Sequence, residues 1–278
     1  MTWQDHIRAG MEKLSQAGIE NAAREARLLW EYASGRSYAD WVLHPEETPK
    51  SIIVVYDQVL GRRVRREPFH YIVGSKEFMG LSLRVSAAVL IPRPETEILV
   101  ETVLDHLPSK IDRVVDVGTG SGAIALALRD RIKNPETRIF GIDPSVKALR
   151  IAAENGKRLG LPVTWLQGSL LDSIENPLDV VVANLPYVST KDRDQLAPEL
   201  SFEPAMALYG GPIGTELIAA LIDAAQRKLV RGGHIFLEVG QGQAPWTMSH
   251  LQGQGFQGCQ TVQDYGGIER VIWAKRED

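Results

Sequence analysis

The stretch VVDVGTGSGAIALAL, residues 114–128, decides the fold of this chain. An apolar run rich in valine is followed by a glycine-rich turn and then by a longer apolar run, the pattern of a buried parallel strand, a tight turn and a helix. Glycine allows positive φ and a close approach of the backbone to a ligand, and the first turn of a helix offers free N–H groups. The stretch therefore predicts an α/β fold with a site for an anionic or polar ligand at Gly118, Gly120 and Gly122.

Strand and helix patterns alternate on the carboxyl side of this stretch. RIFGID (138–143), VTWLQG (163–168), DVVVAN (179–184) and GHIFLEVG (233–240) are typical of strands, with helical patterns between them. We expect an α/β domain with a mostly parallel sheet over residues 95–278. Residues 1–70 show helical spacing, and EFMGLSLRV (77–85) alternates around Gly80, so we expect a small helical domain and a β-hairpin linker over residues 71–94.

The helical domain carries further local signals. Gly35 is expected to end a helix, and Thr48 before Pro49 is expected to cap the start of another. The basic run GRRVRRE (61–67) predicts a solvated helix end, with a docking patch for an acidic partner as the alternative. Large aromatic residues are expected in the core of this domain: Trp3, Trp30 and Trp41.

Composition excludes several classes of protein. The net charge of −4 and the charged fraction of 24% are ordinary for a globular protein and do not favour bulk nucleic-acid binding. The six histidines are scattered without metal-binding spacing, and the single cysteine, Cys259, cannot form an internal disulfide. We find neither a signal peptide nor an apolar run near the ~18 residues of a membrane span. We expect a cytoplasmic protein without a metal site or membrane contact.

Two acidic residues accompany the glycine-rich turn. Asp116 precedes Gly118 by two residues, and Asp143 ends the next strand, where a carboxylate can accept hydrogen bonds from both hydroxyls of a ribose. Asp143 can alternatively cap the helix that follows. Gly118, Gly120 and Ala123 also satisfy the dinucleotide-binding pattern, so a nicotinamide-dependent oxidoreductase, or a binding module without catalysis, stays open at this point.

The fourth strand of the domain ends in VVANLPY, residues 181–187. Asn and Pro close a run of β-branched residues, and the carboxyl ends of parallel strands are where ligands bind in open α/β sheets. One interpretation is a turn that only ends the strand. The other places Asn184, Leu185, Pro186 and Tyr187 in a functional site.

Taken together, DVGTGSG (116–122), GIDPS (141–145) and NLPY (184–187) resemble the class I S-adenosylmethionine-dependent methyltransferases. More narrowly, VLIPRPETE (89–97), SFEPAMALYGGPIGTELI (201–218) and DYGGIERVIWA (264–274) resemble the release-factor glutamine N5-methyltransferases, the PrmC/HemK family. The resemblance implies a Rossmann-like sheet of seven strands, S-adenosylmethionine as cofactor, and a helical domain that recognises a release factor in translation termination. A nucleic-acid amino methyltransferase acting on adenine N6 or guanine N2 is the alternative, because these nitrogens are also planar.

The resemblance also implies roles for residues. The Asn184 oxygen and the main-chain carbonyl of Leu185 would accept the two hydrogens of a glutamine amide, Pro186 would fix the turn, and Tyr187 would stack on the amide or wall its slot. Leu185 stands where the family usually has proline, and Ser169 and Leu170 stand where it usually has an acid near the adenine. The expected cofactor-binding residues are Asp116, Gly118, Thr119, Gly120, Ser121, Gly122, Asp143, Leu170 and Asn184.

Overall fold

The computed structural model describes residues 2–45, 47–108, 110–175 and 177–277. These residues form two compact units. The first contains the chain up to Ser75 together with the distant segment Ala197–Phe202. The second contains Lys76–Leu196 and the chain from Glu203 onward.

The first unit is helical, as predicted. The expected end of a helix at Gly35 is confirmed, because this residue has a φ of 66° and its N–H donates to the carbonyl of Glu31. The expected cap at Thr48 is wrong by one residue: Pro49 is the N-cap, and no side chain caps this helix. The helical segments are α1 (Trp3–Gln16), α2 (Ala22–Ser34), α3 (Tyr38–Leu43), α4 (Lys50–Val64), α5 (Phe69–Val73) and the 3₁₀ turn η2 (Pro198–Phe202).

An aromatic cluster forms the core of this unit. Trp30 makes edge-on contacts with Trp41 and Tyr56, at ring-centroid distances of 5.6 and 5.1 Å, and Trp3 lies 6.0 Å from Trp41. All four rings are buried. The prediction that the tryptophans are core residues is confirmed, and the helices are held by the burial of large apolar surfaces.

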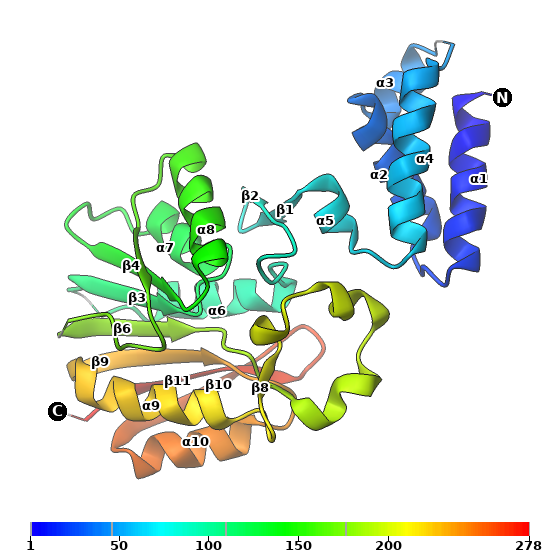
Figure 1. Cartoon of the computed structure of the whole chain (residues 1–278). Helices are drawn as coiled ribbons and strands as arrows, with labels where there is room; N and C mark the ends of the chain where they lie inside the picture. The colour runs from blue at the N-terminus through cyan, green and yellow to red at the C-terminus, as the bar shows by residue number, and fades with distance from the viewer. Residues whose placement is uncertain (1, 46, 109, 176, 278) are drawn as a thin grey trace. The chain divides into compact units, whose positions relative to one another are not determined.

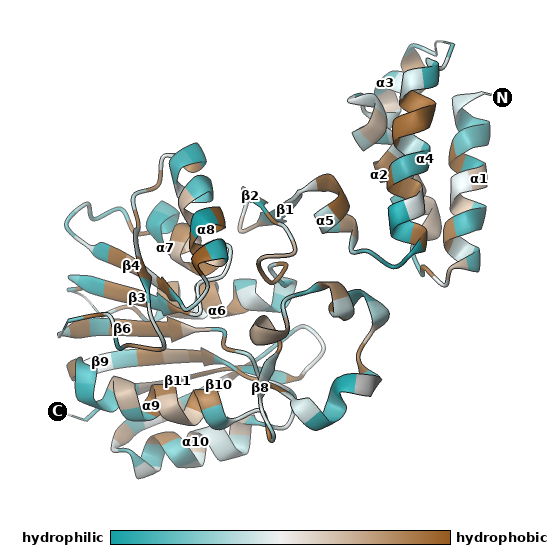
Figure 2. Ribbon diagram, in the orientation of Figure 1, coloured by the Kyte–Doolittle hydropathy of each residue, from teal (hydrophilic) through white to brown (hydrophobic). Residues whose placement is uncertain are grey.

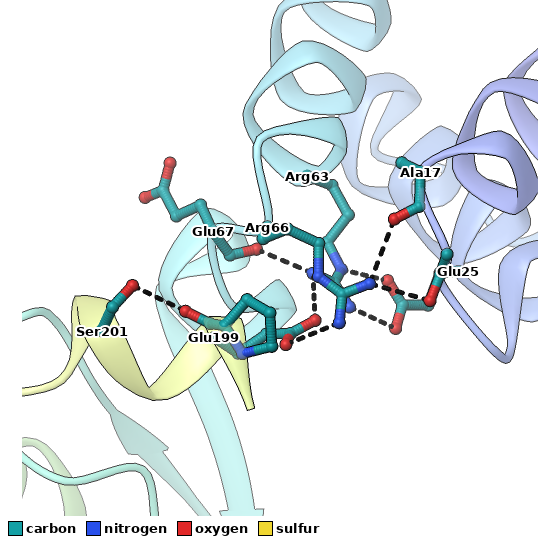
Figure 3. Close-up of polar contacts among 9 residues, drawn as sticks. Ala17, Glu25, Arg63, Arg66, Glu67, Glu199 and Ser201 are labelled. Carbon is teal, nitrogen blue, oxygen red and sulfur yellow. Dashed lines mark hydrogen bonds and ion pairs between the residues drawn. The ribbon is translucent and has the colours of Figure 1, made fainter. Parts of the chain in front are cut away.

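The basic run at the end of α4 is only partly a solvated helix end, since Arg65 is exposed and Arg63 is not. Arg63 is only 6% exposed, and its guanidinium donates to Glu25 at 2.5 Å and to Glu199 at 3.1 Å. Arg66 donates to the other carboxylate oxygen of Glu199 at 2.8 Å, and Figure 3 shows both arginines directed at this glutamate. Arg62 is paired with Glu67. The solvated-end interpretation is therefore wrong for Arg63, which is buried and paired within the unit, whereas Arg62 and Arg66 are paired but partly exposed.

The second unit is built on a mostly parallel sheet. Within the described residues the sheet has seven strands in the order β10-β11-β9-β6-β3-β4-β5, and only the pairs β10–β11 and β11–β9 are antiparallel. This confirms the predicted fold class. The strands are β3 (Arg113–Val117), β4 (Arg138–Asp143), β5 (Thr164–Gln167), β6 (Leu178–Ala183), β9 (Leu229–Glu238), β10 (Phe256–Gln263) and β11 (Glu269–Arg276).

Helices cover both faces of this sheet (Figure 1). Val182 and Phe236 pack in the core under α6 and α7, whereas Val181 and Leu237 pack under α9 and α10. Successive residues of a strand point to opposite faces, so this alternation fixes the face of the residues that follow each strand. The central strand β6 is drawn mostly brown in Figure 2, as expected for a strand buried on both faces. The helices are α6 (Pro94–Asp105), α7 (Ala123–Arg131), α8 (Val146–Leu159), α9 (Glu216–Lys228) and α10 (Ala244–Gly253).

The predicted hairpin is confirmed. Strands β1 (Ser75–Phe78) and β2 (Leu81–Arg84) pair with each other, and Met79 and Gly80 between them have φ values of 51° and 79°. Positive φ at both central residues is the geometry of a tight hairpin turn. The remaining short elements are β7 (Val188–Ser189), η1 (Thr190–Gln195), η3 (Ala205–Ala207) and β8 (Tyr209–Gly211). In the described part of the chain, every helix is too short or too polar to cross a membrane.

Candidate active site

The carboxyl ends of three neighbouring strands form one row. Val117 is in register with Ile142 on β4 and with Ala183 on β6. The residues that stand at the next level are therefore Gly118, Asp143 and Asn184. Because the strand order reverses at β3, this row lies at the position where open α/β sheets bind their ligands.

A pocket of about 760 Å³, open to solvent, lies at this row. Most of its lining is apolar, with a few polar groups between apolar walls. The predicted residues among its lining are Gly118, Gly120, Asp143, Ser169, Leu170, Asn184, Leu185 and Pro186.

Gly118, in the glycine-rich turn, packs against the segment Asn184–Tyr187 that follows β6, which we call the signature. Its φ is 75°, and a Cβ atom at this position would lie 3.0 Å from Cδ2 of Leu185. Any larger residue would therefore be strained and would push Leu185 away. Leu185 is buried and is one of the residues that line the pocket.

Asp143 holds the turn through its carboxylate. One oxygen accepts from the Gly120 N–H at 2.9 Å, and the other accepts from the Ser145 N–H at 2.8 Å. Burial raises the pKa of Asp143. The alternative prediction that Asp143 caps the next helix is wrong: Ser145 is the N-cap of α8, and its hydroxyl accepts from the Ala148 N–H. Each oxygen of Asp143 keeps a further lone pair for a ligand in the pocket.

Asp116 is fully buried beneath the turn and does not line the pocket. Its Oδ2 accepts from the Thr119 hydroxyl at 2.6 Å and from the Ala125 N–H at 3.2 Å. Its Oδ1 has no hydrogen-bond partner among the residues that the structure describes. Burial raises the pKa of Asp116 to about 7, so it carries an ionised, under-satisfied carboxylate at slightly alkaline pH.

The other predicted cofactor residues divide into two groups. Thr119 and Ser121 are buried in the turn, and Gly122 is the N-cap of α7 with a φ of 82°. These three residues shape the turn and do not line the pocket. Leu170 lines the pocket with a φ of 50°, a conformation that is uncommon for leucine. Ser169 lies beside it. The described residues contain no group of His, Cys, Asp or Glu that could hold a metal ion.

The signature residues are held by different neighbours. The Asn184 amide donates from Nδ2 to the Thr96 hydroxyl at 3.0 Å, and its Oδ1 has no partner among the described residues. The carbonyl of Tyr187 accepts from Gln243 at 3.0 Å. Burial, together with the charge of Glu238, raises the pKa of Tyr187 to about 12, so its hydroxyl stays neutral. Tyr187 does not line the pocket, unlike Asn184, Leu185 and Pro186.

Several residues of the site were not predicted from the sequence. Thr96 and Glu238 hold the Asn184 amide from behind, and Met206 and Leu217 add apolar wall to the pocket. Glu203 accepts from Arg93 at 2.6 Å and from the Ile91 N–H at 3.3 Å, so it holds the segment that directly follows the wall residues Val89 and Leu90. Thr96 lies within VLIPRPETE (89–97), and the resemblance of this stretch to the family was the one sequence feature that pointed to it.

Comparison with known proteins supports both units. A family model described as the PrmC N-terminal domain matches residues 5–74, and one described as a methyltransferase domain matches residues 114–201. The release factor glutamine methyltransferase of Geobacter sulfurreducens is 37% identical and covers 93% of this chain and 91% of that protein. The one of Deinococcus radiodurans is 35% identical and covers 99% of each. A solved methyltransferase from Pyrococcus furiosus, 16% identical, covers 78% of this chain and 99% of that one with a TM-score of 0.57, which shows likeness of fold alone.

Proposed function

The chain belongs to the release factor glutamine methyltransferase family, and from this premise we propose that it methylates the side-chain amide nitrogen, N5, of a glutamine in a peptide chain release factor. The cofactor of this family is S-adenosyl-L-methionine. The match covers nearly the whole chain and both units, so the proposal does not rest on one motif.

Two features of the pocket support this cofactor. The carboxylate of Asp143 offers two acceptors for ribose hydroxyls, and Leu170 with Leu217 offers apolar surface for adenine. Thr119, Ser121 and Gly122 keep the turn in shape and are proposed to act on the cofactor through Gly118 and Gly120.

Asn184 is proposed as the catalytic residue. The lone pair of an amide nitrogen is delocalised into its carbonyl, so the nitrogen attacks only when its hydrogens are held and its lone pair is aimed. The Oδ1 of Asn184, at the pocket and without a partner, can accept one of these hydrogens. The main-chain carbonyl of Leu185 can accept the other hydrogen. Because this acceptor belongs to the backbone, leucine can supply it as well as the proline that the family usually has there. This unpartnered oxygen is the observation that carries the proposed role.

The reaction needs no strong base before the attack. When bound, S-adenosylmethionine would supply an electrophilic methyl group and would leave as the neutral thioether, and the methylated amide nitrogen would give one proton to water. Asn184 and the carbonyl of Leu185 stabilise the positive charge that develops on the nitrogen. Pro186 fixes the backbone of the slot, and Tyr187, neutral at working pH, supports its wall.

The helical domain, residues 1–70, is proposed to recognise the release factor, with residues 71–94 as a linker and residues 95–278 as the catalytic domain. Every proposed cofactor residue lies in the last of these. The internal pairing of Arg62, Arg63 and Arg66 supports a protein rather than a nucleic acid as substrate, because these charges are already matched. A cytoplasmic location, without nucleic-acid or membrane binding, follows from this proposed substrate.

The test is methyl transfer to purified release factor. The enzyme is incubated with labelled S-adenosylmethionine and a release factor, and the modified peptide is located by mass spectrometry. We expect one modified glutamine, and no transfer when that glutamine is replaced by glutamate. Transfer to RNA or DNA under the same conditions, with unmodified release factor, would contradict the proposal and support the base methyltransferase.

A further inference from the structure

Asn184 and Glu238 end neighbouring parallel strands at the same level. Ala183 on β6 is in register with Leu237 on β9, so the next residues, Asn184 and Glu238, stand side by side. Each lies two residues after a strand residue that packs under α6, Val182 or Phe236, so both side chains point to the α6 face of the sheet. Thr96, in the first turn of α6, lies over the pair and bonds to both side chains.

The hydroxyl of Thr96 has a fixed direction in this cluster. An ionised carboxylate can only accept hydrogen bonds, so the Thr96 hydroxyl donates its single hydrogen to Glu238, at 2.7 Å. The hydroxyl oxygen then has only lone pairs left, and it must accept. Of the two ends of the Asn184 amide, only Nδ2 can donate, and it lies 3.0 Å from Thr96.

This arrangement decides which end of the amide meets the substrate. With Nδ2 committed to Thr96, Oδ1 is left at the pocket, where the proposed mechanism needs an acceptor. With the amide turned by 180°, the pocket would receive a donor, and the glutamine hydrogens would face hydrogens. Nitrogen and oxygen of an amide are nearly equal in shape, so packing alone does not select the orientation.

We propose that Thr96 and Glu238 are positioning residues that hold the Asn184 amide with its oxygen toward the substrate. The inference rests on the proposed function, because it explains how the acceptor in that mechanism is kept in place. Neither residue touches the reacting atoms; Glu238 acts through Thr96, and Thr96 acts through Asn184.

Glu238 is surrounded by several charges. It is 2% exposed, and burial raises its pKa to about 7. That value includes a lowering by the Thr96 hydrogen bond, a rise from the charge of Glu95, on α6, and a lowering by Arg270, on β11, and Arg93, before α6. Tyr187 stays neutral beside it. Below about pH 7 Glu238 becomes protonated, no longer requires the hydrogen of the threonine hydroxyl, and releases the orientation of the amide.

The test compares Thr96→Val and Thr96→Ser with a matched control, Thr102→Val. Valine has the shape of threonine without the hydroxyl, and serine restores the hydroxyl. Thr102 is a buried threonine of the same helix whose hydroxyl donates to the Ile98 carbonyl at 2.7 Å, so its replacement measures the general cost of the same change. Single-turnover methylation of release factor is followed from pH 6 to pH 9 at saturating cofactor, with cofactor affinity and thermal unfolding measured on each variant.

We expect Thr96→Val to lower the turnover rate at pH 8 by roughly 10-fold to 100-fold, with cofactor affinity within a few-fold of the parent. Thr96→Ser should recover most of the rate. The parent rate should fall as the pH drops through about 7, and the Thr96→Val rate should be flat there. The inference would be overturned, with the proposed function intact, if Thr96→Val kept the parent's rate and pH profile. It would also be overturned if Thr96→Val and Thr102→Val lost turnover rate equally. A parent enzyme that binds cofactor but leaves release factor unmethylated would overturn the proposed function, and the inference with it.

Discussion

The carboxylate of Asp143 accepts a hydrogen bond of 2.9 Å from the backbone N–H of Gly120, which ties the end of β4 to the turn after β3. The same carboxylate also holds the start of the loop before α8 through Ser145. One side chain therefore both shapes the cofactor turn and faces the pocket, so its removal should affect binding in two ways.

Asp143→Ala should weaken S-adenosylmethionine binding by about 10-fold to 100-fold, because hydrogen bonds to a charged acceptor are lost. Isothermal titration measures the affinity directly. Asp172→Ala is the control, since Asp172 is an exposed aspartate outside the pocket lining. Parental affinity in a folded Asp143→Ala enzyme would contradict the ribose assignment.

Local motifs made one part of the site predictable, and sheet register made the other part unpredictable. Gly118 and Asn184 directly follow a strand pattern and Asp143 ends one, so their position at the carboxyl edge could be predicted from the sequence. Thr96 and Glu238 are 142 residues apart, and their contact depends on which strand lies beside β6 and on how α6 crosses it. No short-range pattern contains that information.

The basic run is a second case in which a contact between distant residues could not be predicted from the sequence. Four arginines in GRRVRRE are typical of a solvated helix end, and the sequence around them gives no sign of burial. Arg63 is buried because Glu199, 136 residues later, returns to the helical unit and pairs with it. Because the pairing residue is so distant in the sequence, the arginine pattern alone could not predict that Arg63 is buried and paired.

Arg63→Ala should destabilise the helical unit, because Glu25 and Glu199 lose a buried partner. Loss of one member of such a cluster typically costs about 3 kcal/mol or more. Denaturant unfolding measures the change, and Arg65→Ala, at the exposed arginine of the same run, should alter stability by less than about 0.5 kcal/mol. Equal effects of the two substitutions would show that burial of Arg63 contributes nothing specific.

Glu238→Gln should stabilise the protein at pH 8 although it alters the active site. The pKa of Glu238 is raised from 4.5 to about 7, so between these values the folded state binds more protons than the unfolded state, and the free energy of unfolding falls as the pH rises. The cost of the buried charge is fully present above about pH 7, and glutamine removes it, which should add up to roughly 3 kcal/mol. Unfolding at pH 5 and pH 8 tests this: the gain should be small at pH 5 and large at pH 8, and the same gain at both would contradict the assigned shift.

Asn184→Asp should lose most of its turnover although aspartate keeps an oxygen in the same place. An ionised aspartate has no donor for Thr96, whose hydrogen is already directed to Glu238, and it would add a second buried carboxylate to the cluster. Cofactor affinity within a few-fold of the parent would show that the pocket is intact. Near-parental turnover would show that the donor of Asn184 is dispensable.

The most direct test of the account is single-turnover methylation of a release factor by the parent and by Asn184→Ala, at saturating S-adenosylmethionine. The substitution removes the oxygen that orients the glutamine amide, and loss of one preorganised group in such a site typically lowers the rate by ~100-fold to 1000-fold. We expect that loss, with cofactor affinity nearly unchanged. An Asn184→Ala enzyme that transfers the methyl group at the parent's rate would show that the signature after β6 is only a turn.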